Sequence, residues 1–180
     1  MDATQEILQY PIGRFVWPMD VTDAEVRHAI HTLEAFPDKL RHAVEDLDDE
    51  ILDTPYRTGG WTIRQVIHHC ADSHMNAYVR FKLALTEDIP IIKPYDQEAW
   101  GELPDHRLPV SISIDLIDAL HRRWTGLLKT LSPAEWDRRF LHPEYEKSLT
   151  LRQVVMNYGW HCEHHLAHVL GGLSRYRAGA

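Results

Sequence analysis

The chain carries the stretch WTIRQVIHHCADSHMNAYVRF at residues 61–81, and a second stretch, LTLRQVVMNYGWHCEHHLAHV, begins with the same pattern 88 positions later, at residues 149–169. In each stretch a threonine, Thr62 or Thr150, is followed three residues on by glutamine, which is the spacing of a capping box at the start of a helix. The apolar residue before each threonine can pack on the first turn, and apolar residues then recur at helical spacing. Both stretches are therefore predicted to be long helices that start alike.

The first of these helices is expected to run to about residue 86, and the second to about Gly171, where a glycine pair is expected to end it. A third capping box, Thr22 with Glu25, opens an earlier helix whose apolar residues continue to Val44. Pro37 lies inside that segment and is expected to bend or break the helix.

One more long helix is predicted around residues 114–128, where apolar residues again recur every three or four positions. Residues 1–20 show no helical period and are expected to form an extended arm. Residues 87–112 hold four prolines and are expected to form a long loop, a length usually kept for binding or lid roles. A short helix at Pro133 and a loop near His142 precede the last helix. The predicted fold is all-α, a single four-helix bundle domain over residues 1–180.

Composition narrows the class of protein. With 44% hydrophobic and 26% charged residues, a chain of 180 residues can bury one sizeable core. The net charge is -8 and the 19 basic residues are dispersed, which argues against a nucleic-acid partner. An N-terminus without an apolar signal region and the lack of a long apolar run predict a protein that is neither secreted nor membrane-spanning, and hence cytoplasmic. Cys70 and Cys162 are expected to be reduced thiols.

Histidine is the unusual component, with 13 residues in the chain. Each residue turns a helix by roughly 100°, so His69, His161 and His165, which lie seven, eleven and fifteen residues after their capping threonines, fall on one flank of their helices. His68 falls on the opposite flank, His164 and His168 lie farther from the apolar stripe than His165 does, and all three are expected to face solvent. His74 lies at the centre of its stripe, so periodicity alone leaves it as a rival to His69 or as a partner of a ligand.

Histidines four residues apart on a helix can turn their ring nitrogens toward one ion, and a third histidine from a facing helix completes three neutral donors. Imidazole suits zinc or nickel, and three protein ligands leave a position open for chemistry. A histidine near an apolar face is, however, more often a hydrogen-bonded core residue, so spacing alone leaves metal binding and core packing both open.

Several stretches closely resemble the YfiT branch of the DinB/YfiT family: YPIG (10–13), DTPYRTGGWTIRQVIHHCADSHMNAYVRFKLALTE (53–87), KPYDQEAWGEL (93–103), HRRWTGLL (121–128) and WHCEHHLAH (160–168). The resemblance implies a four-helix bundle, commonly a homodimer, that binds one nickel or zinc ion per subunit. By motif position it implies His69, His161 and His165 as the ligands. The pair Cys162-Glu163 departs from the small polar or histidine residues expected between the last two ligands.

Three functions follow from this prediction. The resemblance implies a metal-dependent hydrolase that activates water on a small-molecule substrate. Relatives in the family imply the alternative of a low-molecular-weight thiol S-transferase, of the bacillithiol type, that binds its thiol as thiolate at the metal. A bundle that only binds a metal or small ligand, without catalysis, is the third. Proton transfer is assigned to no single residue, and the side chains considered for it are Glu163, His164, His74 and Asp72.

Overall fold

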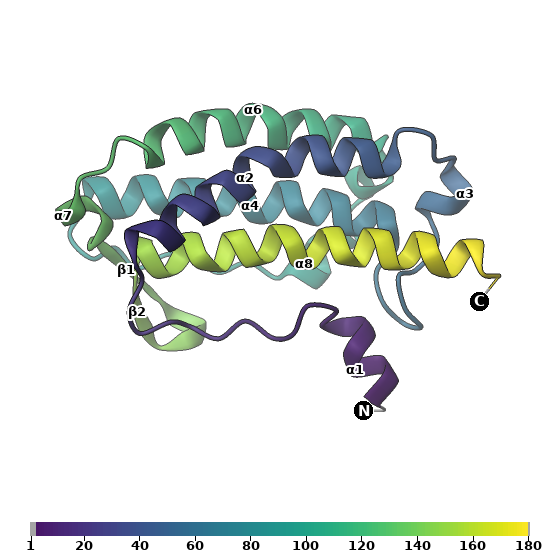
Figure 1. The fold of residues 1–180 in the computed structure, drawn as a ribbon, viewed down its shortest axis with the longest axis horizontal. Coiled ribbons are helices and arrows are strands. Elements are labelled where there is room, and N and C mark those ends of the chain that lie inside the picture. Colours follow the sequence, from purple (N-terminus) through teal and green to yellow (C-terminus); the bar gives the residue numbers. More distant parts are fainter. Residues whose placement is uncertain (1–2, 180) are drawn as a thin grey trace.

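The computed structural model describes residues 3–179, and four long helices lie side by side along its length (Figure 1). They are α2 (Asp23–Val44), α4 (Ile63–Thr86), α6 (Val110–Leu128) and α8 (Leu151–Arg177). The short helices are α1 (Ala3–Gln9), α3 (Asp49–Leu52), α5 (Gln97–Gly101) and α7 (Pro133–Trp136), with 3-10 turns η1 (Pro104–Arg107) and η2 (Pro143–Tyr145) and strands β1 (Arg139–His142) and β2 (Lys147–Thr150). The predicted four-helix bundle is confirmed.

The three capping boxes start the helices where the sequence predicts. The hydroxyl of Thr62 accepts a hydrogen bond from the Gln65 backbone N–H at 3.1 Å, and the Gln65 side chain accepts one from the Thr62 N–H at 3.0 Å. Thr22 and Thr150 cap α2 and α8 in the same way. These bonds satisfy backbone donors that the first turn of a helix leaves unpaired, so each box sets the start of its helix.

The order of the helices around the bundle is not that of the chain. α2 packs against α8 and α6, and α4 packs against α6 and α8, so the consecutive long helices α2 and α4 lie diagonally across the bundle. In Figure 1, α4 and α6 run in the same direction, opposite to α2 and α8. The connection between α4 and α6 must therefore return along the bundle, and α5 and η1 within it pack on α4.

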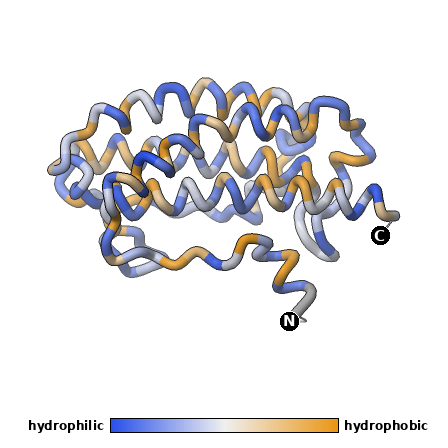
Figure 2. Tube along the Cα trace, in the orientation of Figure 1, coloured by the Kyte–Doolittle hydropathy of each residue, from blue (hydrophilic) through white to orange (hydrophobic). Residues whose placement is uncertain are grey.

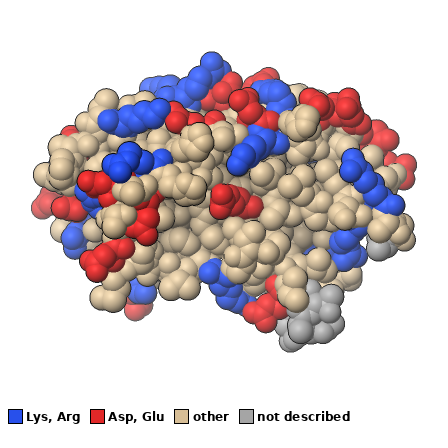
Figure 3. All heavy atoms as spheres, viewed as in Figure 1, with Lys and Arg blue, Asp and Glu red and all other residues tan. Residues whose placement is uncertain are grey.

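Apolar side chains of all four helices fill the interior, and along the helices in Figure 2 apolar positions alternate with polar ones. Trp124, Phe36 and Phe81 are the bulkiest fully buried side chains. Pro37 is also buried, and α2 continues through it without a break. Cys70 and Cys162 are buried free thiols. No helix among residues 3–179 has the length and apolar character needed to span a membrane, and on the face shown in Figure 3 basic and acidic side chains are interspersed.

Four sequence-based expectations about local structure are corrected. The arm at residues 1–20, of which 1 and 2 lie outside the described residues, contains helix α1 before it becomes extended. The glycine pair does not end α8, because at Gly172 a side chain would meet Ile63 at 3.0 Å; the missing Cβ lets the helix pass the start of α4 and continue. The long loop at 87–112 contains α5 and η1, and α6 already begins at Val110.

The fourth correction concerns the loop expected near His142, which is a β-hairpin. β1 and β2 pair antiparallel, with Arg139 opposite Thr150 and His142 opposite Lys147. Ile91 of the long connection forms a bridge with Leu141 of β1, so the hairpin and the connection are tied together at one end of the bundle. Strands of four residues are too short to show a clear alternation in the sequence.

Gly159 of α8 packs closely against α2. A Cβ at this position would lie 3.1 Å from the Ala29 Cβ and 3.2 Å from the Ala29 Cα. Gly159→Ala is expected to destabilise the protein, because a Cβ there crowds the backbone of Ala29 and overpacking of this kind costs about 1–3 kcal/mol, whereas alanine gains at most ~1 kcal/mol over glycine in a helix. Gly171→Ala in the same helix meets nothing within 4 Å and is expected to stabilise it. Urea unfolding of both variants measures the difference, and equal midpoints would contradict this packing argument.

Candidate metal centre

His69, His161 and His165 meet where α4 packs against α8. Their ring centroids are 5.4 Å apart for His69 and His161, 4.9 Å for His69 and His165, and 4.3 Å for His161 and His165. One ring nitrogen from each lies within 4.8 Å of the other two. The three histidines that the sequence places on one flank are thus brought together by the α4–α8 contact.

Burial keeps these three rings neutral. It lowers the pKa of His69 to about 3 and holds the pKa values of His161 and His165 well below the ordinary range, with the neighbouring histidines adding to the effect. Neutral imidazole is the form that donates a lone pair to a metal ion. Three neutral donors of this kind, close enough to share one ion, fit zinc or nickel.

No further ligand closes the site. Among residues 3–179, no fourth histidine, cysteine or carboxylate atom joins these three within the same 4.8 Å. An ion held by three side chains keeps at least one coordination position for another molecule.

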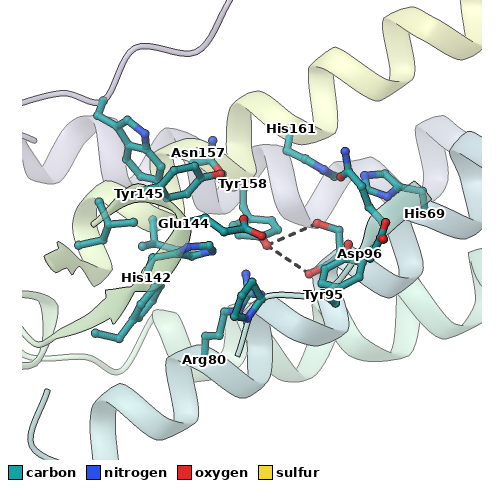
Figure 4. Close-up of a pocket in the computed structure, with 17 residues that line it drawn as sticks. His69, Arg80, Tyr95, Asp96, His142, Glu144, Tyr145, Asn157, Tyr158 and His161 are labelled. Carbon is teal, nitrogen blue, oxygen red and sulfur yellow. Dashed lines mark hydrogen bonds between the residues drawn. The ribbon is translucent and has the colours of Figure 1, made fainter. Parts of the chain in front are cut away.

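Two of the three histidines, His69 and His161, line a cavity of about 630 Å³. Figure 4 shows His69 and His161 at one end of it, Tyr158 and Arg80 farther along, and His142 and Tyr145 of the hairpin region at the other end. The Tyr158 hydroxyl donates to the Ser73 carbonyl at 3.2 Å, and burial raises its pKa. A molecule in this cavity would have one end beside His69 and His161.

A smaller cavity of about 280 Å³ is lined by all three histidines, His69, His161 and His165. Trp61 and Trp160 line this smaller cavity, whereas Tyr158 lines the larger one and Trp124 is fully buried in the core. Aromatic side chains near the histidines are therefore divided between the core and the walls of the two cavities.

The four residues considered for proton transfer occupy different places. Glu163 is exposed and lines neither cavity. Asp72 accepts from the His106 ring at 2.9 Å and also lines neither cavity. His74 is fully buried, with its Nε2 3.0 Å from the Nδ1 of His161. His164 lines the smaller cavity beside Trp160, its ring centroid 4.2 Å from that of the indole.

The expectation that His68, His164 and His168 face solvent is wrong, since none is more than 6% exposed. The connection before α6 covers His68, whose Nε2 donates to the Leu108 carbonyl at 3.0 Å. The N-terminal segment covers the other two: Tyr10 stacks near His164, and His168 donates to the Gln9 carbonyl at 3.1 Å. Segments far away in the chain bury faces that look polar on the isolated helices.

Sequence reasoning missed several residues of the site. His121 of α6 lies 2.6 Å from His74, and Arg80, Tyr95 and His142 line the larger cavity. The signal for Tyr95 was present, because the long proline-containing connection was expected to have a binding role. His121 had no such signal, since a single histidine in an apolar stripe does not show what it will contact.

Comparison with known proteins gives consistent results. Residues 32–169 match the model of the DinB superfamily. The chain is 52% identical over 161 residues to a protein of Oceanobacillus iheyensis named "Putative metal-dependent hydrolase", covering 89% of this chain and 93% of the relative. It is 49% identical over 162 residues to a protein of the same description from Bacillus mycoides, covering 90% and 93%.

Among solved structures, the chain is similar to YfiT from Bacillus subtilis, described as a probable metal-dependent hydrolase with an unusual four-helix bundle topology. The TM-score is 0.91 at 46% identity, and the match covers 96% of this chain and 98% of the other. With more than half of its length matched by the family model and a fold shared almost end to end with YfiT, the chain belongs to the DinB superfamily.

Proposed function

We propose that this protein is a divalent-metal-dependent hydrolase in which His69, His161 and His165 hold one zinc or nickel ion. The observation that carries the proposal is the convergence of three neutral imidazoles, two of which line a cavity of about 630 Å³, without a fourth side-chain ligand among the described residues. The names of the relatives support the same reaction class. A divalent ion at such a site supplies a Lewis acid and lowers the pKa of water.

The chain's own residues would bind and orient the substrate. The larger cavity combines the cationic Arg80, whose guanidinium donates to the Lys93 carbonyl at 3.1 Å, with the acidic Asp96 and Glu144. Both signs of charge in one cavity suit a small polar molecule better than an apolar one. Tyr158 and Ser73, joined by their hydrogen bond, line the same cavity.

The same geometry admits a second reaction, because a thiol can take the open position in place of water. Transfer of a low-molecular-weight thiol is therefore the alternative function, and simple metal or ligand binding is the non-enzymatic one. Homodimer formation and a cytoplasmic location stay predictions from the sequence.

An assay with two arms distinguishes these functions. Protein loaded with zinc or with nickel is incubated with a panel of ester and amide substrates, and in parallel with monochlorobimane and a panel of cellular thiols. We expect hydrolysis that disappears after chelation and returns with the metal. Thiol conjugation without hydrolysis would replace the proposal by the transferase, and tight metal binding with no turnover in either arm would favour a binding protein.

A further inference from the structure

Each of the two α8 histidines of the site, His161 and His165, contacts a buried histidine, and each contact starts a chain of hydrogen bonds that ends at a backbone carbonyl. We call each of these two chains a relay. On one side, His161 Nδ1 lies 3.0 Å from His74 Nε2, and His74 Nδ1 lies 2.6 Å from His121 Nε2. His121 Nδ1 in turn lies 2.6 Å from the Leu33 carbonyl oxygen. His74 and His121 are 0% and 1% exposed, so water does not compete for these contacts.

The Leu33 carbonyl sets the donor and acceptor of every hydrogen bond in this first relay. A carbonyl oxygen only accepts, so the hydrogen of His121 is on Nδ1, and a neutral ring then has an acceptor at Nε2. His74 must therefore donate from Nδ1 to His121 and accept at Nε2. His161 must donate from Nδ1 to His74, which leaves a lone pair on its Nε2.

A second relay has the same logic. His165 Nδ1 lies 3.3 Å from His168 Nδ1, and His168 Nε2 lies 3.1 Å from the carbonyl oxygen of Gln9, the last residue of α1. Because that carbonyl only accepts, His168 carries its hydrogen on Nε2 and accepts at Nδ1. His165 then donates from Nδ1 and keeps the lone pair on Nε2. Tyr56 stacks on His168 with centroids 4.0 Å apart and holds the ring in place.

This second relay also bears on a neighbouring cluster. His164, His165 and His168 form another group whose ring nitrogens lie within 4.8 Å of one another. His168 uses one nitrogen to donate to Gln9 and the other to accept from His165, so it has no lone pair left for an ion. The group is explained by the relay and is not a second metal site.

We infer that His74, His121 and His168 are positioning residues that hold His161 and His165 in the Nδ1–H tautomer, so that both present Nε2 to a metal ion. The inference rests on the proposed function for the identity of the ligand, but the tautomers are a property of the metal-free protein. It gives α1, α2 and α6 a role in the site, since the two carbonyls belong to Gln9 of α1 and Leu33 of α2, and His121 lies on α6. Partners of this kind typically change metal affinity 10–100-fold when removed.

The test reads the tautomers directly, by two-bond ¹H–¹⁵N correlation spectra of the histidine rings in chelator-treated protein. We expect His161 and His165 as Nδ1–H tautomers and His168 as the Nε2–H tautomer. Detection of His161 or His165 as the Nε2–H tautomer would overturn the inference, and this measurement needs neither a variant nor bound metal. Failure of the proposed function therefore leaves this result standing.

Two variants then test the relays separately. His121→Leu removes the end of the first relay, and His168→Phe removes the second while keeping an aromatic ring against Tyr56. We expect each to lower zinc affinity 10–100-fold in competition with a chelating dye, to mix the tautomers of its own ligand only, and to retain helical circular dichroism. His106→Gln, a change at a buried histidine outside both relays, is the matched control. If both relay variants keep the zinc affinity and the ligand tautomers of the unaltered protein, the positioning role is refuted, even though the protein binds zinc.

Discussion

Replacing His161 with alanine is expected to reduce bound zinc or nickel from about one ion per chain to near zero. The change removes one of three donors and leaves His69 and His165 on different helices with no third nitrogen. Loss of a residue that only holds a ligand in place lowers metal affinity about 10–100-fold, so loss of a ligand is expected to lower it more than about 100-fold. Metal content by mass spectrometry after dialysis measures the effect, and the hydrolysis proposed above should disappear with the metal.

The helical fold of this variant is expected to persist, because the core is filled by apolar side chains from four helices and does not depend on an ion. Circular dichroism separates loss of metal from loss of fold. Glu163→Ala is the matched control, since Glu163 is exposed on the same helix two residues away and should leave metal content unchanged. Full metal content in His161→Ala would remove this residue from the site.

The second large effect is a steep loss of stability in mild acid. Burial lowers the pKa to about 3 for His69 and His164 and to about 4 for His121 and His168. In the unfolded chain these rings take up a proton below about pH 6.5. Between that pH and the lowered pKa values the unfolded state binds more protons than the folded one, so the free energy of unfolding decreases as the pH falls.

The size of this effect is comparable with the stability of the whole domain. Each ring costs about 1.4 kcal/mol per pH unit in that interval, so four rings cost roughly 5 kcal/mol per unit against a typical total of about 5–15 kcal/mol. We expect the metal-free protein to unfold between about pH 6 and pH 4. Urea unfolding at a series of pH values measures the slope.

A variant without one relay ring sharpens this measurement. His168→Phe should lower the slope of the unfolding free energy against pH by about one proton, whereas Gly171→Ala, which removes no titratable group, should leave the slope unchanged. An unfolding free energy that stays constant from pH 7 to pH 5 would contradict the account of the buried histidines.

Local chemistry in the sequence was sufficient for the four long helices, apart from the start of α6 and the end of α8, and for the three central histidines. A capping box acts within four residues, so Thr22, Thr62 and Thr150 mark helix starts without reference to the rest of the chain. Helical periodicity placed His69, His161 and His165 on one flank, and the resemblance to the family selected His69 over His74. The structure brings these three rings together, with His74 behind His161.

The sequence could not show which distant segments of the chain pack on each helix face. His68 and His168 lie off the apolar stripes, and only the segments before α6 and around Gln9 bury them. The pairing of His74 with His121 and the walls of the larger cavity likewise join residues that are dozens of positions apart. The sequence by itself determined the four long helices and the flank that carries His69, His161 and His165, because both depend on residues within a few turns. Tertiary structure alone decided which histidines are buried, which of them contact one another and what encloses the cavity, because these depend on packing between distant segments.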